Sequence, residues 1–259
     1  PVTFYKDLTL LMETIRKKTD AKVILGGAAV GVMPEALLRF TQADCAVLRD
    51  GEIIFPKVLE MHSSDKMPNN IPGIAWIEDT GFRIHTGYSD RFSDSSLVPD
   101  FCRWIDLPAY VSRFSPIPIQ TKLGCHFKCV YCTYRKIEGE DYRLCDPQTI
   151  AGTIVDLEKR GIGDIEFVDN VFNSPYDHAI ALCDTIAKVR TNTRLQTVEL
   201  NPLFVDDNLI GVMEQAGFVG IGITVESAAD AVLERLKKGF TGKHVYKASE
   251  VIKRHKIPC

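Results

Sequence analysis

The clearest pattern in the chain is an alternation of short apolar runs and longer amphipathic segments after residue 116. The apolar runs predict strands over 116–123, 164–168, 195–200 and 219–225. Between them apolar residues recur at helical spacing, as at Ile150, Ile154 and Leu157. Repeated strand–helix units predict a β/α barrel or an open α/β sheet, in which sites lie at the carboxyl ends of strands.

Capping residues predict where three of these helices begin. Asp146 stands before a proline, and Ser174 and Ser227 each follow a predicted strand and precede a helical pattern. Residues 257–259 have the composition of a fifth strand. We therefore expect the barrel to be truncated inside that strand.

A similar alternation covers residues 1–65. Apolar runs predict buried strands at 21–25 and 45–48, with helices before, between and after them. The first strand is followed by Gly26 and Gly27, which either form a tight turn or let a ligand approach the backbone closely. This order predicts a parallel, doubly wound sheet.

Residues 66–115 have the composition of a hairpin and a linker. Two short apolar runs, 74–77 and 82–85, flank a polar turn and predict the hairpin. Trp104, Tyr110 and Phe114 are expected to anchor the linker on the domain that follows.

Composition excludes several classes of protein. The chain has 259 residues, 45% of them hydrophobic, and a net charge of −3, so no basic field indicates nucleic acid. No apolar run approaches the ~20 residues that a membrane span needs. Eight cysteines are too dilute for a disulfide scaffold, which favours a reducing, cytoplasmic location.

Cys125, Cys129 and Cys132 form a C-x3-C-x2-C group directly after the predicted strand 116–123. Thiolates are soft ligands that suit iron–sulfur clusters and zinc. A structural zinc site or a closed cluster takes a fourth ligand, whereas three cysteines leave one iron of a four-iron cluster open. A zinc knuckle completed by His126 or Cys145, or three free thiols, are the alternatives.

Polar side chains follow the predicted strands of the second region. They are Asp169, Asn170, Asn201, Glu226 and Ser227. Each of them could cap a helix or bind a ligand. Glu226 favours ligand binding, because a carboxylate ending an apolar run is costly to bury unless it is paired or bound.

The cysteine spacing, with the aromatic Tyr131 before the last cysteine, resembles the radical S-adenosylmethionine (SAM) superfamily. The resemblance implies a 4Fe-4S cluster on the three cysteines, with the open iron chelating the amino and carboxylate groups of SAM. It also implies reductive cleavage of SAM to methionine and a 5′-deoxyadenosyl radical. An electron donor such as flavodoxin or ferredoxin would then be a partner.

Further segments share this resemblance. Residues 220–227 are similar to the fourth-strand segment that holds SAM by its ribose and methionine ends, which implies contacts from Glu226 and Ser227. Residues 167–172 resemble the second-strand end that faces the methionine end, which implies Asp169 and Asn170. Tyr131 would lie near the adenine and contribute backbone contacts.

The N-terminal region resembles the second half of the cobalamin-binding domain that precedes many radical SAM cores. The resemblance implies corrin contacts at Gly26 and Gly27. The expected fold is therefore α/β: a partial Rossmann-like domain (1–65), a hairpin and linker (66–115) and a partial radical SAM barrel (116–259). We expect residues 1–259 alone to lack tight cobalamin binding and turnover.

The leading functional expectation is transfer of a methyl group from methylcobalamin to an unactivated carbon or phosphorus. The substrate would be a small, natural-product-like molecule. A radical cyclisation or rearrangement is the alternative within enzymes, and a zinc-stabilised binding module is the alternative outside them.

Overall fold

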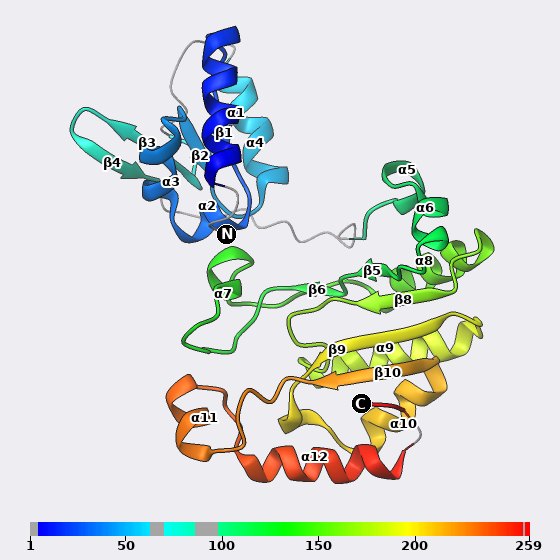
Figure 1. The fold of residues 1–259 in the computed structure, drawn as a ribbon. Coiled ribbons are helices and arrows are strands. Elements are labelled where there is room, and N and C mark those ends of the chain that lie inside the picture. The colour runs from blue at the N-terminus through cyan, green and yellow to red at the C-terminus, as the bar shows by residue number, and fades with distance from the viewer. Residues whose placement is uncertain (1–4, 63–69, 86–97, 256) are drawn as a thin grey trace. The chain divides into compact units, whose positions relative to one another are not determined.

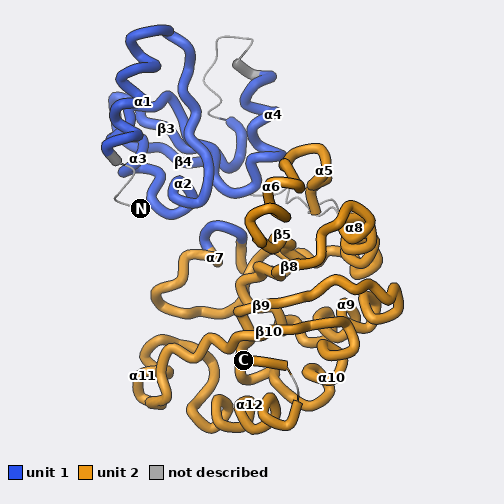
Figure 2. Tube along the Cα trace, turned by 45° about the vertical axis from the view of Figure 1, so that its right-hand side comes forward, with its two compact units in different colours: residues 1–93, 136–138 blue, residues 94–135, 139–259 orange. Residues whose placement is uncertain are grey.

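The computed structural model describes residues 5–62, 70–85, 98–255 and 257–259 (Figure 1). The chain divides into two compact units, one of residues 1–93 and 136–138 and one of residues 94–135 and 139–259 (Figure 2). The short helix α7 (Tyr134–Ile137) is divided between them. The predicted boundary between residues 65 and 66 lies outside the described residues.

The first unit contains a sheet of four strands in the order β1-β2-β3-β4. These are β1 (Ile24–Leu25), β2 (Cys45–Val47), β3 (Ile74–Glu78) and β4 (Gly81–Ile84). β1 and β2 are parallel, as predicted, but β3 pairs antiparallel with β2 and with β4. The predicted hairpin thus belongs to this sheet, because Ile74 and Ala75 are fully buried in it, and the sheet is mixed.

Helices α1 (Tyr5–Lys18), α3 (Pro34–Thr41) and α4 (Gly51–His62) confirm the predicted pattern of this unit, whereas α2 (Ala28–Val32) was not expected. β1 is shorter than the predicted 21–25. The amide of Val23 donates to the side chain of Asp44 at 2.7 Å. The carbonyl of Val23 accepts from the amide of Asp44 at 2.9 Å, so Asp44 binds Val23 through both its side chain and its backbone.

The second unit is built on a parallel sheet in the order β10-β9-β8-β5, which confirms the predicted strand–helix repeat. Its strands are β5 (Ile117–Ile119), β8 (Asp164–Phe167), β9 (Arg194–Leu200) and β10 (Phe218–Ile223). The predicted strand 116–123 is divided, because β6 (Lys122–Leu123) pairs antiparallel with β7 (Arg143–Leu144) in a separate ribbon. The amide of Ile221 donates to the carbonyl of Pro258 at 3.0 Å, so residues 257–259 begin to pair with β10.

Helices cover one face of this sheet (Figure 1). They are α8 (Pro147–Lys159), α9 (Tyr176–Val189), α10 (Asp207–Ala216) and α12 (Gly242–Arg254). Their apolar faces share one core with the strands, including Ile150, Leu182, Leu209 and Val251. The shorter elements are α5 (Phe101–Trp104), α6 (Leu107–Ser112), η3 (Pro202–Phe204) and α11 (Asp230–Leu236).

One predicted cap is confirmed and two are wrong. Asp146 accepts from the amide of Thr149 at 3.0 Å and begins α8. Ser174 does not cap α9, whose N-cap is Pro175 with no side-chain bond. Ser227 lies before α11, and its hydroxyl accepts from the amide of Ala229 at 3.1 Å, a local turn that delays the helix.

Only one of the three aromatic residues expected to anchor the linker packs on the second unit. Tyr110 packs against the core of the second unit. Trp104 and Phe114 are 69% and 96% exposed, so the prediction that they pack on this domain is wrong. Phe114 has a φ of 52°, in the left-handed region, where the chain turns before β5.

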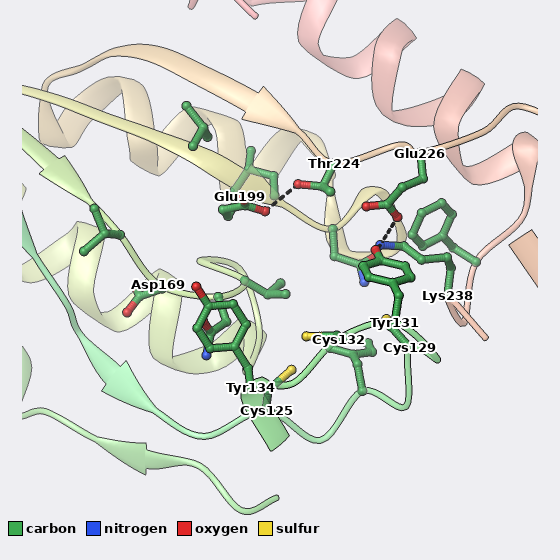
Figure 3. A pocket seen from close by; sticks show the side chains of 18 residues that line it. Cys125, Cys129, Tyr131, Cys132, Tyr134, Asp169, Glu199, Thr224, Glu226 and Lys238 are labelled. Carbon is green, nitrogen blue, oxygen red and sulfur yellow. Dashed lines mark hydrogen bonds and ion pairs between the residues drawn. The ribbon is translucent and has the colours of Figure 1, made fainter. Parts of the chain in front are cut away.

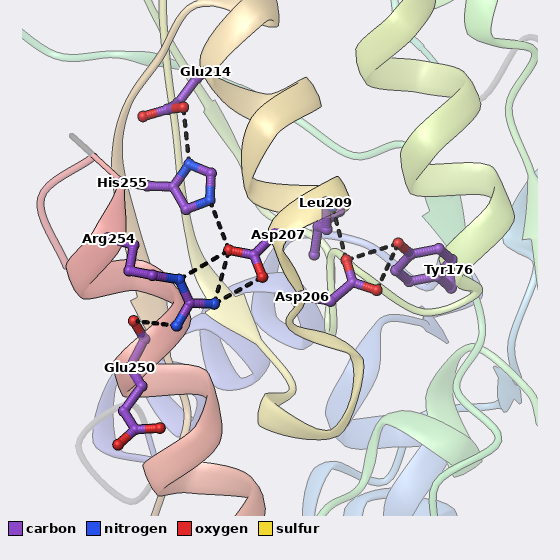
Figure 4. A network of polar contacts seen from close by, with 8 residues as sticks. All are labelled: Tyr176, Asp206, Asp207, Leu209, Glu214, Glu250, Arg254 and His255. Carbon is purple, nitrogen blue, oxygen red and sulfur yellow. Dashed lines mark hydrogen bonds and ion pairs between the residues drawn. The ribbon is translucent and has the colours of Figure 1, made fainter.

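A polar network joins the end of α12 to α10 (Figure 4). His255 Nδ1 lies 2.9 Å from Glu214 Oε2, and its Nε2 lies 3.3 Å from Asp207 Oδ1. Arg254 donates to both oxygens of Asp207. The hydrogen bond to Glu214 raises the pKa of His255 against the opposing effect of burial, and Asp207 adds to the increase.

This network predicts a pH-dependent contribution to stability. Because the folded pKa of His255 lies above its unfolded value of about 6.5, its stabilising effect is complete below that pH and is lost as pH rises through the folded pKa. The loss of melting temperature in His255→Gln should therefore be larger near pH ~6 than near pH ~9. Arg194→Gln, which removes a separate exposed ion pair with Asp164, is the control with a constant loss. An equal loss at both pH values for His255→Gln would contradict the assignment.

Candidate active site

A cavity of about 340 Å³ opens in the second unit where β8, β9 and β10 end (Figure 3). Its size is within the range of about 300–1,000 Å³ that is usual for small-molecule sites. The carboxyl ends of parallel strands are the positions where α/β proteins bind ligands. The lining side chains labelled in Figure 3 are Cys125, Cys129, Tyr131, Cys132, Tyr134, Asp169, Glu199, Thr224, Glu226 and Lys238.

All three predicted cysteines line this cavity, and none of them is in a disulfide. Cys125 is 5% exposed, whereas Cys129 and Cys132 are half-buried. Cys145 is buried outside the cavity lining, and burial raises its pKa to about 11. Within the described residues, no three His, Cys, Asp or Glu side chains converge to hold a single metal ion. The thiols are instead arranged around a ligand-sized space.

The beginning of the cysteine loop requires a glycine. Gly124 has a φ of 91°, and a Cβ there would lie 2.1 Å from the carbonyl oxygen of Asp141. The next amide, of Cys125, donates to the carbonyl of Gly139 at 3.1 Å. These contacts hold the first cysteine against the segment that follows the loop.

The end of the loop is held by a lysine that the sequence did not single out. Lys238 Nζ donates to the hydroxyl of Tyr131 at 3.0 Å and forms an ion pair with Glu226. The amide of Val130 donates to the carbonyl of Leu236 at 3.1 Å. The loop is thereby attached to the segment after β10, as Figure 3 shows for the side chains.

Burial and neighbouring groups shift the pKa values of Lys238, Tyr131 and Cys129. Burial lowers the pKa of Lys238, but the bonds to Glu226 and Tyr131 outweigh it and raise the pKa. Burial and the Glu226 carboxylate raise the pKa of Tyr131. Burial also raises the pKa of Cys129, against the opposing charge of Lys238. A metal would bind the thiolate and displace the proton.

Glu226 lies at the mouth of the cavity, as its position after the fourth strand predicted. Its φ of 58° is in the left-handed region, which is unfavourable for a residue with a side chain. The expectation that such a carboxylate is paired or ligand-bound is met by Lys238, whose side chain is 9% exposed. The two side chains present one negative and one positive group to the cavity.

Asp169 and Asn170 both line the cavity, but the carboxylate of Asp169 is engaged elsewhere. It accepts bonds from Thr121 and Lys122, on the segment that leads into the cysteine loop. Asn201 also lines the cavity, and its side chain accepts from the amide of Leu203 at 2.9 Å. That bond makes it the cap of η3.

Two further polar residues reach the cavity. Glu199 Oε2 accepts from the hydroxyl of Thr224 at 2.6 Å, between β9 and the end of β10. This pair was not predicted from the sequence, although a glutamate inside the apolar run 195–200 was an available signal for it. Lys238 had no comparable signal, because it follows another lysine after a helix.

The remaining predicted residues are not part of this cavity. Ser227 is absent from its lining. Gly26 and Gly27 belong to the first unit, where they follow β1. Gly27 has a φ of 94°, and a Cβ built at either glycine would meet no atom of the part of the chain that the structure describes within 4 Å. The backbone after β1 is therefore open to a ligand.

The donor set of the cavity fits an open iron–sulfur cluster with a small molecule on its free iron. Three thiols supply soft ligands, and no other cysteine belongs to the lining. The adjoining space holds a carboxylate, an ammonium group and apolar side chains such as Val168 and Val198. Within the described residues, no helix has the length and apolar character that crossing a membrane requires.

Comparisons with known proteins agree with this chemistry. The model of the Radical SAM superfamily matches residues 119–259. The cytidylyl-2-hydroxyethylphosphonate methyltransferase of Streptomyces wedmorensis is 23% identical over 252 residues, covering 85% of this chain and 47% of the relative. The chain spans about half the length of the curated relatives that it matches first.

Solved structures show the same fold. The radical SAM methyltransferase TsrM of Kitasatospora setae, with cobalamin and a 4Fe-4S cluster bound, has a TM-score of 0.81 at 21% identity, covering 98% of this chain and 51% of that chain. The cobalamin-dependent SAM radical enzyme OxsB, with aqua-cobalamin and SAM bound, has a TM-score of 0.79 at 17% identity, covering 98% and 38%.

The predicted family is thus confirmed, and it favours a cluster over the zinc alternative. The matched segment includes the cysteine loop, the parallel strands β8, β9 and β10, and the cavity at their carboxyl ends. Family membership implies a 4Fe-4S cluster and SAM as the cofactors of this site. The matched residues make up more than half of the chain, which belongs to the radical SAM superfamily.

Proposed function

We propose that this chain is part of a cobalamin-dependent radical SAM methyltransferase. The observation that carries the proposal is the set of three thiols, none in a disulfide, that line one cavity beside the Glu226–Lys238 ion pair. When bound there, the cluster would pass an electron from an external reductant to SAM, giving methionine and a 5′-deoxyadenosyl radical. Cys125, Cys129 and Cys132 would hold it.

The cavity walls suit the remaining groups of SAM. SAM carries an amino group and a carboxylate at one end, and Glu226 and Lys238 present the complementary charges near Cys129. Glu199 and Thr224 add a polar pair at the ends of β9 and β10. Val168 and Val198 are 43% and 56% exposed and add apolar surface that a bound ligand would cover.

Methyl transfer is the reaction that the comparisons support best. TsrM and the Streptomyces wedmorensis relative are both named methyltransferases. A TsrM structure with a SAM analogue also holds a tryptophan substrate, which supports a small-molecule substrate. A cyclisation or rearrangement would share radical formation and differ in its products. No feature of the cavity favours it.

The first unit is the proposed site of cobalamin. Gly26 and Gly27 lie at the carboxyl end of β1, where doubly wound sheets bind their ligands, and leave the backbone open. We assign corrin contacts to these two glycines. Flavodoxin or ferredoxin is the proposed electron donor. The cytoplasm is the proposed location, because the three thiols must stay reduced to hold a cluster.

The cluster assignment predicts the loss of one chromophore. Replacing Cys125, Cys129 or Cys132 with alanine should abolish the broad absorbance near ~400 nm of anaerobically reconstituted protein and its reductive SAM cleavage. Cys183→Ala is the matched control, because that thiol is fully buried and outside the cavity lining. Full iron content in Cys129→Ala would contradict the assignment.

A role for Glu226 in seating SAM predicts weaker binding without its carboxylate. Loss of a charge-assisted hydrogen bond should cost about 1.5–3 kcal/mol, or about ten- to a hundredfold in affinity. Calorimetric titration of cluster-loaded Glu226→Ala with SAM measures this change. Glu234→Ala, an exposed carboxylate on α11, is the control. Unchanged affinity in Glu226→Ala would limit Glu226 to pairing with Lys238.

The cobalamin proposal is tested with the complete protein that carries these residues. A Cβ at Gly26 meets no atom of the described residues within 4 Å, so weaker methylcobalamin binding by Gly26→Val would report contact with the corrin. Gly163→Ala, which is equally unobstructed, is the control. Unaltered methylcobalamin affinity in Gly26→Val would contradict the proposed corrin contact.

The same protein also allows a test of radical formation. Incubation with SAM, reductant and methylcobalamin should yield 5′-deoxyadenosine.

A further inference from the structure

A buried ion pair beside the cysteine loop has no role in the function proposed above. The side chains of Lys122 and Asp169 are 2% and 0% exposed, and Lys122 Nζ lies 3.2 Å from Asp169 Oδ2. Lys122 Nζ also donates to the carbonyl of Phe172 at 3.1 Å. Burial of two charges is unfavourable unless both are well paired, so a change to one partner leaves an uncompensated charge.

Asp169 also binds the segment that leads into the cysteine loop. Its Oδ1 accepts from the amides of Thr121 and Lys122 at 2.7 and 3.2 Å, and its Oδ2 accepts from the hydroxyl of Thr121 at 2.7 Å. The carbonyl of Thr121 in turn accepts from the amide of Cys145 at 2.9 Å. Thr121 and Lys122, four and three positions before Cys125, are thus fixed to the carboxyl end of β8.

The location of the two partners separates a positioning role from direct ligand contact. Asp169 lines the cavity, but Lys122 and Thr121 are absent from the lining. A ligand in the cavity could therefore reach Asp169 without reaching Lys122. If Asp169 acts by fixing the loop, changes to either member of the pair should have the same consequence.

We infer that Lys122 and Asp169 are positioning residues, whose ion pair fixes the stem of the cysteine loop to β8 and so places Cys125 for cluster binding. This inference rests on the proposed cluster at the three cysteines. In this role Asp169 positions the cysteine loop and does not contact SAM. Partners that orient metal ligands commonly change metal affinity by about 10–100-fold when they are replaced.

The test compares Lys122→Met, Asp169→Asn and the double variant during anaerobic cluster reconstitution. Each single change leaves one buried charge unpaired, so the iron concentration for half-maximal loading should rise about tenfold or more. The double variant removes both charges, and an asparagine at the second position still accepts from Thr121. The iron concentration for half-maximal loading of the double variant should therefore return most of the way to the wild-type value.

A second readout separates positioning from ligand binding. In the cluster-loaded fraction of each variant, titration with SAM followed by electron paramagnetic resonance should give the wild-type midpoint. Asp164→Asn is the matched control. Asp164 begins β8 and pairs with Arg194 at 2.6 Å on the exposed surface, so its loss should leave loading unchanged.

Several outcomes would overturn the inference. They are wild-type loading of both single variants, no recovery in the double variant, or a weakened SAM midpoint in Asp169→Asn with normal loading. If the single variants fail to accumulate, loading of the double variant decides alone. A wild-type protein that takes up no iron would overturn both the proposed function and this inference. If the wild-type protein loads iron normally, the outcomes above for the variants overturn only the inference.

Discussion

The attachment of the cysteine loop to a parallel sheet is the constraint on which the site depends. A loop of this length has no core of its own, so its position must come from the strands beneath it. Asp169 holds the stem at the end of β8, and Lys238 holds Tyr131 to Glu226 after β10. The three thiols consequently face a space that the rigid sheet also borders.

This arrangement explains how one region can combine a cluster with a reactive ligand. Parallel strands end at one edge, so polar residues from β8, β9 and β10 share a cavity although they are distant in sequence. The helices that cover one face of the sheet form the hydrophobic core together with the strands. The left-handed backbone of Glu226 and the buried ammonium of Lys238 are unfavourable in isolation, and each is compensated by their ion pair.

Local patterns predicted the second unit well. Apolar runs and helical spacing were sufficient for its parallel sheet, because each strand is buried and each helix has one apolar face. Contacts between distant residues were not predictable in this way. The Lys238–Tyr131 bond spans 107 positions, and the mixed sheet of the first unit depends on the pairing of Val47 with Ile74. The prediction that Ser227 caps a helix was wrong, because its hydroxyl forms a local turn before the helix begins.

Cys125, Cys129 and Cys132 are proposed to hold a cluster whose remaining iron binds SAM. Mössbauer spectroscopy of protein reconstituted with the iron-57 isotope, recorded before and after SAM is added, distinguishes that iron from the other three. SAM should change the isomer shift of a single iron site and leave the thiolate-bound sites unchanged. Identical spectra with and without saturating SAM would contradict the proposed cluster.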